Sequence, residues 1–337
     1  MSDLVAACGQ AAHTATNFAD LASQAGLDAR ALRALCIREG LPLEFLELRT
    51  VLMARHPLAR PERDPLMHLR DAARRERLPS SVKGPVTHLF EQGDEPFAVV
   101  FTGDWHIGEA GTDHARLARD VELLASLKAE YGDRLRIVAM GDYIGGYMRS
   151  KTPANTHQIL DPREQREAAC EALRLIRPDL VIEGDHDGWH SRQDDQHEWL
   201  AEFCEDEGFA HVQWGATLEF LTGSGWTPRI LARHRFDGSR RVNPDLPQIN
   251  LHGQFGPADV VALAHVHSNP GVRVARPKRH TEAEFFSVQS GTYKVFDEYA
   301  KKLGLGSGEY GVPAVLIDPH AGTITPSDLA DLADQGW

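Results

Sequence analysis

The sequence of 337 residues lacks the cysteine patterns that cross-link small domains and the long apolar runs that anchor proteins in membranes. Its cysteines, Cys8, Cys36, Cys170 and Cys204, lack the paired spacing of a zinc ribbon or a disulfide framework. No apolar run is long enough to cross a membrane, and no basic stretch followed by an apolar one resembles a signal peptide. These absences predict a cytoplasmic protein with reduced thiols and no membrane partner.

Positive charge is also scarce. The formal net charge is −13, and residues 1–90 carry 12 Lys+Arg and 10 Asp+Glu, whereas residues 91–337 carry 24 and 39. An acidic domain does not attract polyanions by its own field, although bound metal ions can reverse the sign locally. Apolar residues are plentiful at 42%, which is enough for a sizeable core in one large domain or two smaller ones.

Residues 1–55 are dense in alanine and leucine at helical spacing, which predicts a small all-helical module. Within it, residues 18–38 resemble a helix-turn-helix DNA-binding module, with Ala22, Gly26 and Leu32 at the small, turn and apolar positions. The alternative is a helical bundle that serves packing or protein contact. In the DNA-binding interpretation, the second helix would present three basic side chains to phosphates: Arg30, Arg33 and Arg38.

Residues 56–95 predict a linker, because prolines recur through them and arginines cluster at residues 70–77. From residue 96 to residue 337, apolar runs typical of strands alternate with amphipathic helices. Two of these helices are expected at about residues 113–131 and 161–176. The order βαβαβ, followed by shorter β-like segments, predicts an α/β sandwich with helices outside.

Short Asp/His clusters follow five of the apolar runs, and each run is typical of a buried strand. Ligands bind at strand ends in α/β sheets, and imidazole and carboxylate are ligands of divalent metals. We therefore predict a metal site at one sheet edge. Residues spaced two apart are expected to share one face of a strand. The clusters are Gly103-Asp104-Trp105-His106, Gly141-Asp142, Gly184-Asp185-His186-Asp187, His234 and Ala264-His265-Val266-His267.

In this order the clusters resemble the calcineurin-like metallophosphoesterase family, whose pattern is DxH, GD, GNH with a following acid, a lone His and GHxH. The resemblance covers about residues 97–320 and implies a four-layer α-β-β-α sandwich. It also implies two metal sites with a shared carboxylate. One ion would be held by Asp104, His106 and His267, the other by Asp185, His234 and His265, and Asp142 would bridge both.

The resemblance implies that a metal-bound hydroxide hydrolyses a phosphomonoester or a phosphodiester, with nucleic acid among the candidate substrates. His186 would protonate the leaving group or stabilise the transition state, and Asp187 would orient its ring. Two divalent ions are expected, manganese foremost, with iron, zinc, nickel or magnesium as alternatives. Substrate contacts are expected from the loop after the bridging acid: Tyr143, Tyr147 and Arg149.

Two positions depart from the family pattern. Asp185 stands where asparagine is usual, which adds negative charge at the second metal, and Ala264 replaces a glycine. The extra carboxylate keeps open an alternative function: a DNA- or protein-binding regulator with a weakly active or inactive phosphoesterase domain. The lone ligand His234 has two rivals, His252 and His211. The sequence predicts neither the substrate nor the oligomeric state.

Overall fold

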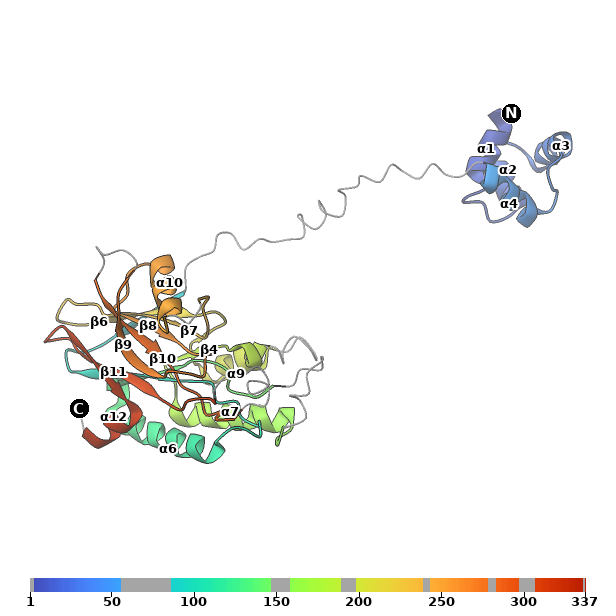
Figure 1. Cartoon of the computed structure of the whole chain (residues 1–337). Coiled ribbons are helices and arrows are strands. Elements are labelled where there is room, and N and C mark those ends of the chain that lie inside the picture. Colours follow the sequence, from blue (N-terminus) through green and yellow to red (C-terminus); the bar gives the residue numbers. More distant parts are fainter. Residues whose placement is uncertain are drawn as a thin grey trace. The chain divides into compact units, whose positions relative to one another are not determined.

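The computed structural model describes residues 3–55, 86–146, 158–188, 198–238, 243–277, 283–296, 307–335 and 337. The chain divides into two compact units, residues 1–82 and 83–337, which are described separately (Figure 1). Among the described residues, we find no helix with both the length and the apolar composition that crossing a bilayer requires.

The described part of the N-terminal unit is helical. Asn17 and Asp28 cap two of its helices, because their side chains accept the backbone N–H groups of Asp20 and Ala31. Gly26, at φ 72°, forms the turn between these two helices. The helices are α1 (Asp3–Ala11), α2 (Phe18–Gln24), α3 (Ala29–Glu39) and α4 (Phe45–Arg55). They share a core that includes Leu21, Leu32, Leu35, Leu48 and Leu52.

The described strands of the second unit form two mixed sheets of six. The first has the order β12 (Thr323–Asp328), β11 (Pro313–Asp318), β2 (Phe97–Thr102), β3 (Leu135–Ala139), β4 (Leu180–Ile182) and β5 (His211–Val212). The second has the order β1 (Val86–Glu91), β6 (Ala216–Leu221), β7 (Arg229–Arg233), β8 (Val260–Leu263), β10 (Phe285–Gln289) and β9 (Gly271–Ala275).

Strand β2 shows how the layers are joined. Its side chains alternate between the two faces of the sheet. Phe97, Val99 and Phe101 pack in the core between the two sheets, whereas Ala98 and Val100 pack in the core under the helices. All residues of β2 are buried, as expected for a strand that is covered on both faces.

Helices cover the outer faces of both sheets, which gives an α/β sandwich with four layers (Figure 1). On the β2 sheet lie α6 (His114–Tyr131), α7 (Pro162–Ile176), α9 (Trp199–Glu207) and α12 (Leu329–Gln335), and a 3-10 turn, η1 (Gly132–Arg134), follows α6. On the opposite sheet lies α10 (Leu246–Phe255). Asp113 caps α6, and Asp161 forms a capping box with Glu164 at the start of α7, so both helices begin where the sequence predicts them.

Part of the expected linker is instead a strand. Residues 86–91 form β1, which pairs in parallel with β6. This strand is hard to predict from the sequence for two reasons. β1 lies at a sheet edge and buries little apolar surface, so its apolar pattern is weak. Pro85, a residue typical of linkers, directly precedes it. Residues 56–85 of the expected linker lie outside the described residues, and residues 92–95 connect β1 to β2.

Candidate metal centre

The clusters of the sequence follow strands that run in the same direction. β2, β3 and β4 are parallel neighbours in one sheet, and β7 and β8 are parallel neighbours in the other. The carboxyl ends of these five strands bring the predicted ligands together. This is the edge at which ligands bind in α/β sheets.

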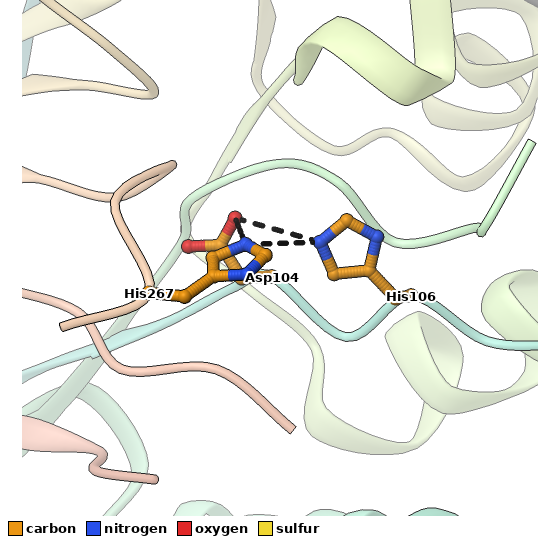
Figure 2. A group of neighbouring side chains, drawn as sticks. All are labelled: Asp104, His106 and His267. Atoms are coloured by element: carbon orange, nitrogen blue, oxygen red, sulfur yellow. Dashed lines mark hydrogen bonds and ion pairs between the residues drawn. The ribbon is translucent and has the colours of Figure 1, made fainter. Parts of the chain in front are cut away.

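The first group of side chains is Asp104, His106 and His267, all within reach of one ion (Figure 2). Oδ1 of Asp104 lies 3.4 Å from Nε2 of His267 and 4.0 Å from Nε2 of His106. The two Nε2 atoms are 3.1 Å apart. Asp104 and His106 are buried, whereas a quarter of the His267 side chain is exposed, so the group opens toward solvent on one side.

The second group is Asp142, His234 and His265. Oδ2 of Asp142 lies 3.2 Å from Nε2 of His234 and 4.0 Å from Nε2 of His106. The carboxylate of Asp142 therefore faces both groups, which is the position expected for a bridging ligand.

Both groups fit a divalent cation. Among the described side chains, several buried ligand atoms have no hydrogen-bond partner, including Oδ1 of Asp104, Nε2 of His234 and Nδ1 of His265. Leaving such atoms buried without a partner is costly. Two ligand atoms about 2.1 Å from one tetrahedral ion lie about 3.4 Å apart. The separations from Asp104 to His267 and from Asp142 to His234, 3.4 and 3.2 Å, are close to that value.

The backbone at four of the predicted ligands is left-handed. φ is 50° at Asp104, 46° at His106, 55° at Asp142 and 65° at His265. Non-glycine residues rarely adopt such angles, which cost about 1–3 kcal/mol each and gather at functional sites. Of the six described non-glycine residues with positive φ, four are predicted ligands, so the strain is concentrated at this edge.

This backbone geometry corrects one expectation. Residues spaced two apart were expected to share one face of a strand, but β2 ends at Thr102 and β8 ends at Leu263, before the ligands begin. The ligands lie on turns that follow the strands. His265 and His267 belong to different groups, as the resemblance implies, whereas Asp104 and His106 belong to the same group.

Two glycines allow the loops after β3 and β4 to touch. A Cβ atom at Gly184 would lie 2.1 Å from the backbone nitrogen of Asp142. A Cβ at Gly141 would lie 2.6 Å from the backbone nitrogen of Gly184 and 2.8 Å from Nδ1 of His234. Any larger residue at either position would push Asp142 away from its partners, which explains why glycine precedes the acids in these clusters.

Charge and burial set the protonation of the ligands. Burial alone lowers the pKa of His234, but the charge of Asp142 outweighs it and raises that pKa to about 10. Burial opposes ionisation of Asp142, yet the neighbouring imidazoles, His234 foremost, hold its pKa well below the usual range. Burial lowers the pKa of His106 to about 4, so this ring is neutral and ready to act as a ligand. A cation entering the second group must displace a proton from His234.

His186 and Asp187 lie in the turn after β4, and Asp187 contacts the backbone of two loops. Its carboxylate accepts the backbone N–H groups of Asp142, Tyr143 and Gly184, and so holds together the loops after β3 and β4. The ring of His186 is anchored by the backbone, because its Nδ1 lies 2.5 Å from the carbonyl oxygen of Gly145. This short bond forms because the loop after Asp142 turns back toward His186, which spacing alone does not reveal.

Asp185 lies beside the second group instead of inside it. Its Oδ2 is 2.5 Å from Nη1 of Arg235 and 3.7 Å from Nδ1 of His265. Arg235 follows His234 directly in the sequence, yet no motif of the sequence points to it. The arginine offsets the negative charge of Asp185.

Glu109 and Lys294 are further site residues, and neither is predicted from the sequence. Oε1 of Glu109 lies 3.3 Å from Nδ1 of His106, and Oε2 lies 2.5 Å from Nζ of Lys294. Glu109 also lies close to His186, and the three side chains His106, Glu109 and His186 could by distance hold an ion. The ammonium of Lys294 on the same carboxylate opposes a cation there, so we assign Glu109 to orienting His106.

Several other predicted residues are not at the site. Tyr143 was expected to contact substrate, but it is fully buried and its hydroxyl donates to the carbonyl of Ile182. Its strand-end position next to Asp142 directs it into the core. His252, a rival of His234, stacks on Phe285 in the core at α10. Nε2 of the second rival, His211, lies 3.8 Å from Oε2 of Glu183.

The other two residues expected to contact substrate, Tyr147 and Arg149, lie outside the described residues.

The three arginines expected to contact DNA, Arg30, Arg33 and Arg38, are exposed on α3. The guanidinium of Arg33 lies 5.7 Å from the ring centre of Phe18, and Arg38 forms an ion pair of 3.0 Å with Glu39. Arg30 and Arg33 are three residues apart and therefore neighbours on the surface of α3, whereas Arg38, five residues after Arg33, projects in another direction.

No family model and no curated protein matches this sequence. Among solved structures, one described as GAP50, the anchor in the inner membrane complex of Plasmodium, matches 69% of this chain and 89% of its own length. The sequence identity is 10% and the TM-score is 0.33, a similarity too low to carry an argument about function.

Proposed function

We propose that residues 83–337 form a metal-dependent phosphoesterase domain that holds two divalent cations, manganese foremost, as the resemblance to calcineurin-like metallophosphoesterases implies. The observation that carries this proposal is the convergence of side chains from the ends of four strands, β2, β3, β7 and β8, into two adjacent ligand groups. Asp142 faces both groups, and the backbone of four of the ligands is strained. An α/β sandwich with helices outside is compatible with that family's fold.

The chemistry follows from this donor set. When bound, two cations would neutralise charge on phosphate oxygens, lower the pKa of a water and stabilise the leaving oxygen. The side chains of the protein position the reacting groups and supply a proton to the leaving-group oxygen. The carbonyl oxygen of Gly145 contacts Nδ1 of His186 and so orients the ring. Nε2 of His186 can then donate a proton to the leaving-group oxygen. Asp187 fixes the loops that carry His186 and Asp142 through three backbone N–H groups.

The test is hydrolysis by the full chain after metal removal and reloading with manganese. We expect release of nitrophenol from p-nitrophenyl phosphate, from bis(p-nitrophenyl) phosphate, or from both. His186→Ala should lower kcat by about 100-fold or more while leaving metal content unchanged, because it removes a proton donor and no ligand. Asp331→Asn, on the exposed surface of α12, is the matched control. A metal-loaded chain with no rate above the buffer blank on either ester would contradict the proposal.

A second proposal is that the N-terminal unit binds DNA and brings the acidic phosphoesterase domain to it. The observation that favours it is the exposure of Arg30, Arg33 and Arg38 on α3, the second helix of a helix-turn-helix arrangement. Replacing Arg30, Arg33 and Arg38 by alanine in the full chain should weaken binding to duplex DNA. The salt slope of the affinity should decrease by about one for each phosphate that an arginine no longer neutralises.

The control for DNA binding is Arg163→Ala, an exposed arginine on α7. Fluorescence anisotropy between about 50 and 200 mM salt separates the outcomes. Binding that is absent at the lowest salt, or equal in the triple variant and the wild type, would favour the alternative in which the helices serve packing or protein contact.

A further inference from the structure

A cavity of about 430 Å³ adjoins the second ligand group. His234 and Asp185 form part of its wall, and the other walls come from the loops that follow β4, β5 and β7. This volume is typical of small-molecule sites. Because His234 is shared by the ligand group and the cavity, a phosphoester bound at the metals would extend its organic part into this space.

One exposed wall of the cavity is a tryptophan on a fixed backbone. The side chain of Trp214 is largely exposed at 66%, although large aromatic rings usually bury most of their surface. Its carbonyl accepts a hydrogen bond of 2.8 Å from Nε of Arg233. At Gly215, φ is 134°, and a Cβ would lie 2.3 Å from Cγ of Arg233. Trp214 therefore lines the cavity with most of its surface exposed, on a backbone that packs tightly against β7.

The charges of the cavity favour a neutral ring over a second phosphate. Its acids are Glu183, Asp185 and Asp237, and its two arginines are already engaged. Arg235 pairs with Asp185, and the guanidinium of Arg233 lies 5.4 Å from the ring centre of Phe236. Oε2 of Glu183 lies 3.8 Å from Nε2 of His211. The carboxylate of Asp237 repels phosphate but accepts hydrogen bonds from N–H groups, which the edges of nucleobases carry.

We propose that this cavity binds the base of a nucleotide phosphoester, stacked on Trp214, while the phosphate lies at the ligand groups. This inference rests on the proposed function for the position of the phosphate and adds the substrate class. Stacking on a tryptophan tolerates any base, because every base has a π-face. The site therefore discriminates phosphoesters of nucleosides from those of aliphatic alcohols or sugars.

The experiment compares two probes that differ only in the base, adenosine 5′-monophosphate and ribose 5-phosphate. Their affinities are measured by calorimetry on the manganese-loaded full chain with His186→Ala, so that turnover does not consume the probe. We expect the nucleotide to bind roughly 10- to 100-fold more tightly, the range expected for one base–aromatic stack. Adding Trp214→Ala should remove this difference, whereas adding Trp214→Phe should retain most of it.

Equal affinities for the two probes, or a difference that persists in Trp214→Ala, would overturn the inference. The proposed function is tested separately, by nitrophenol release from the two nitrophenyl esters with the manganese-loaded wild-type chain. Base-dependent binding without hydrolysis of either ester would support the cavity assignment and contradict the phosphoesterase. Hydrolysis of an ester together with equal affinities for the two probes would support the phosphoesterase and contradict the cavity assignment.

Discussion

The ammonium of Lys294 lies 2.5 Å from one carboxylate oxygen of Glu109, and the other oxygen of Glu109 lies 3.3 Å from Nδ1 of His106. This chain of contacts leaves Nε2 of His106 directed at Asp104 and His267. A carboxylate that accepts the proton of one ring nitrogen fixes the tautomer in which the other nitrogen can bind metal.

Glu109→Ala is therefore expected to weaken manganese binding by about 10- to 100-fold, the usual effect of losing a residue that orients a metal-binding histidine. Glu109→Gln should lose less, because the amide oxygen still accepts from His106. Calorimetric titration of the metal-stripped chain measures both variants, and Glu130→Ala, exposed on α6, is the matched control. An affinity of Glu109→Ala equal to that of the control would rule out the orienting role.

The thermal stabilisation produced by manganese should increase with pH. The pKa of His234 is raised from 6.5 to about 10, so without metal its protonated form contributes stability that is complete below pH 6.5 and lost as the pH rises through about 10. The cation competes with this proton, so metal binding strengthens with rising pH. We expect the difference in Tm with and without manganese to grow between about pH 6 and about pH 8.5.

The control for this pH dependence is His320→Asn, an exposed histidine away from the ligand groups. It should retain the trend, whereas His234→Gln should flatten it. A stabilisation by manganese that stays constant over this pH range in the wild type would show that no proton is displaced from the site.

Asp185→Asn tests whether the departure from the family pattern attenuates catalysis. Arg235 already offsets the charge of Asp185, and their ion pair is partly exposed to solvent. Removing the carboxylate should therefore change kcat/KM by less than about threefold, measured with the two nitrophenyl esters. Arg235→Ala should tighten manganese binding a few-fold, because it frees the carboxylate beside His265.

The two controls for Asp185 are Arg163→Ala and Asp331→Asn, which make the same chemical changes on exposed helices. A large gain in rate for Asp185→Asn would instead favour the alternative of a regulator whose phosphoesterase domain is weakly active.

Ligands that directly follow a buried strand could be predicted from the sequence. Asp104, Asp142 and His234 follow apolar runs, and the topology of parallel strands brings such residues to one edge. The helices α6 and α7 were predicted from their caps and apolar spacing. Apolar runs, helix caps and apolar spacing are local features of the sequence. They predict the structure because each depends on a single buried strand or a single amphipathic helix.

Residues that act through contacts distant in the sequence could not be predicted. Glu109 contacts Lys294 because the loop after β2 lies against the segment after β10. The cavity at Trp214 is formed by loops that follow three different strands, β4, β5 and β7. The role of Asp187 depends on a turn that aims its carboxylate at three backbone N–H groups. Left-handed angles at ligands are likewise set by the surrounding loops, because the local sequence disfavours them.

The central claim, a pair of cations that share Asp142, is tested most directly by the metal content of the chain. The full chain is loaded with manganese, freed of excess metal by gel filtration and analysed by mass spectrometry of the elements, beside Asp142→Ala and the control Asp331→Ala. We predict about two ions per chain in the wild type and in the control, and less than about one in Asp142→Ala. A wild-type chain without stoichiometric metal, or an Asp142→Ala chain that keeps both ions, would contradict the account.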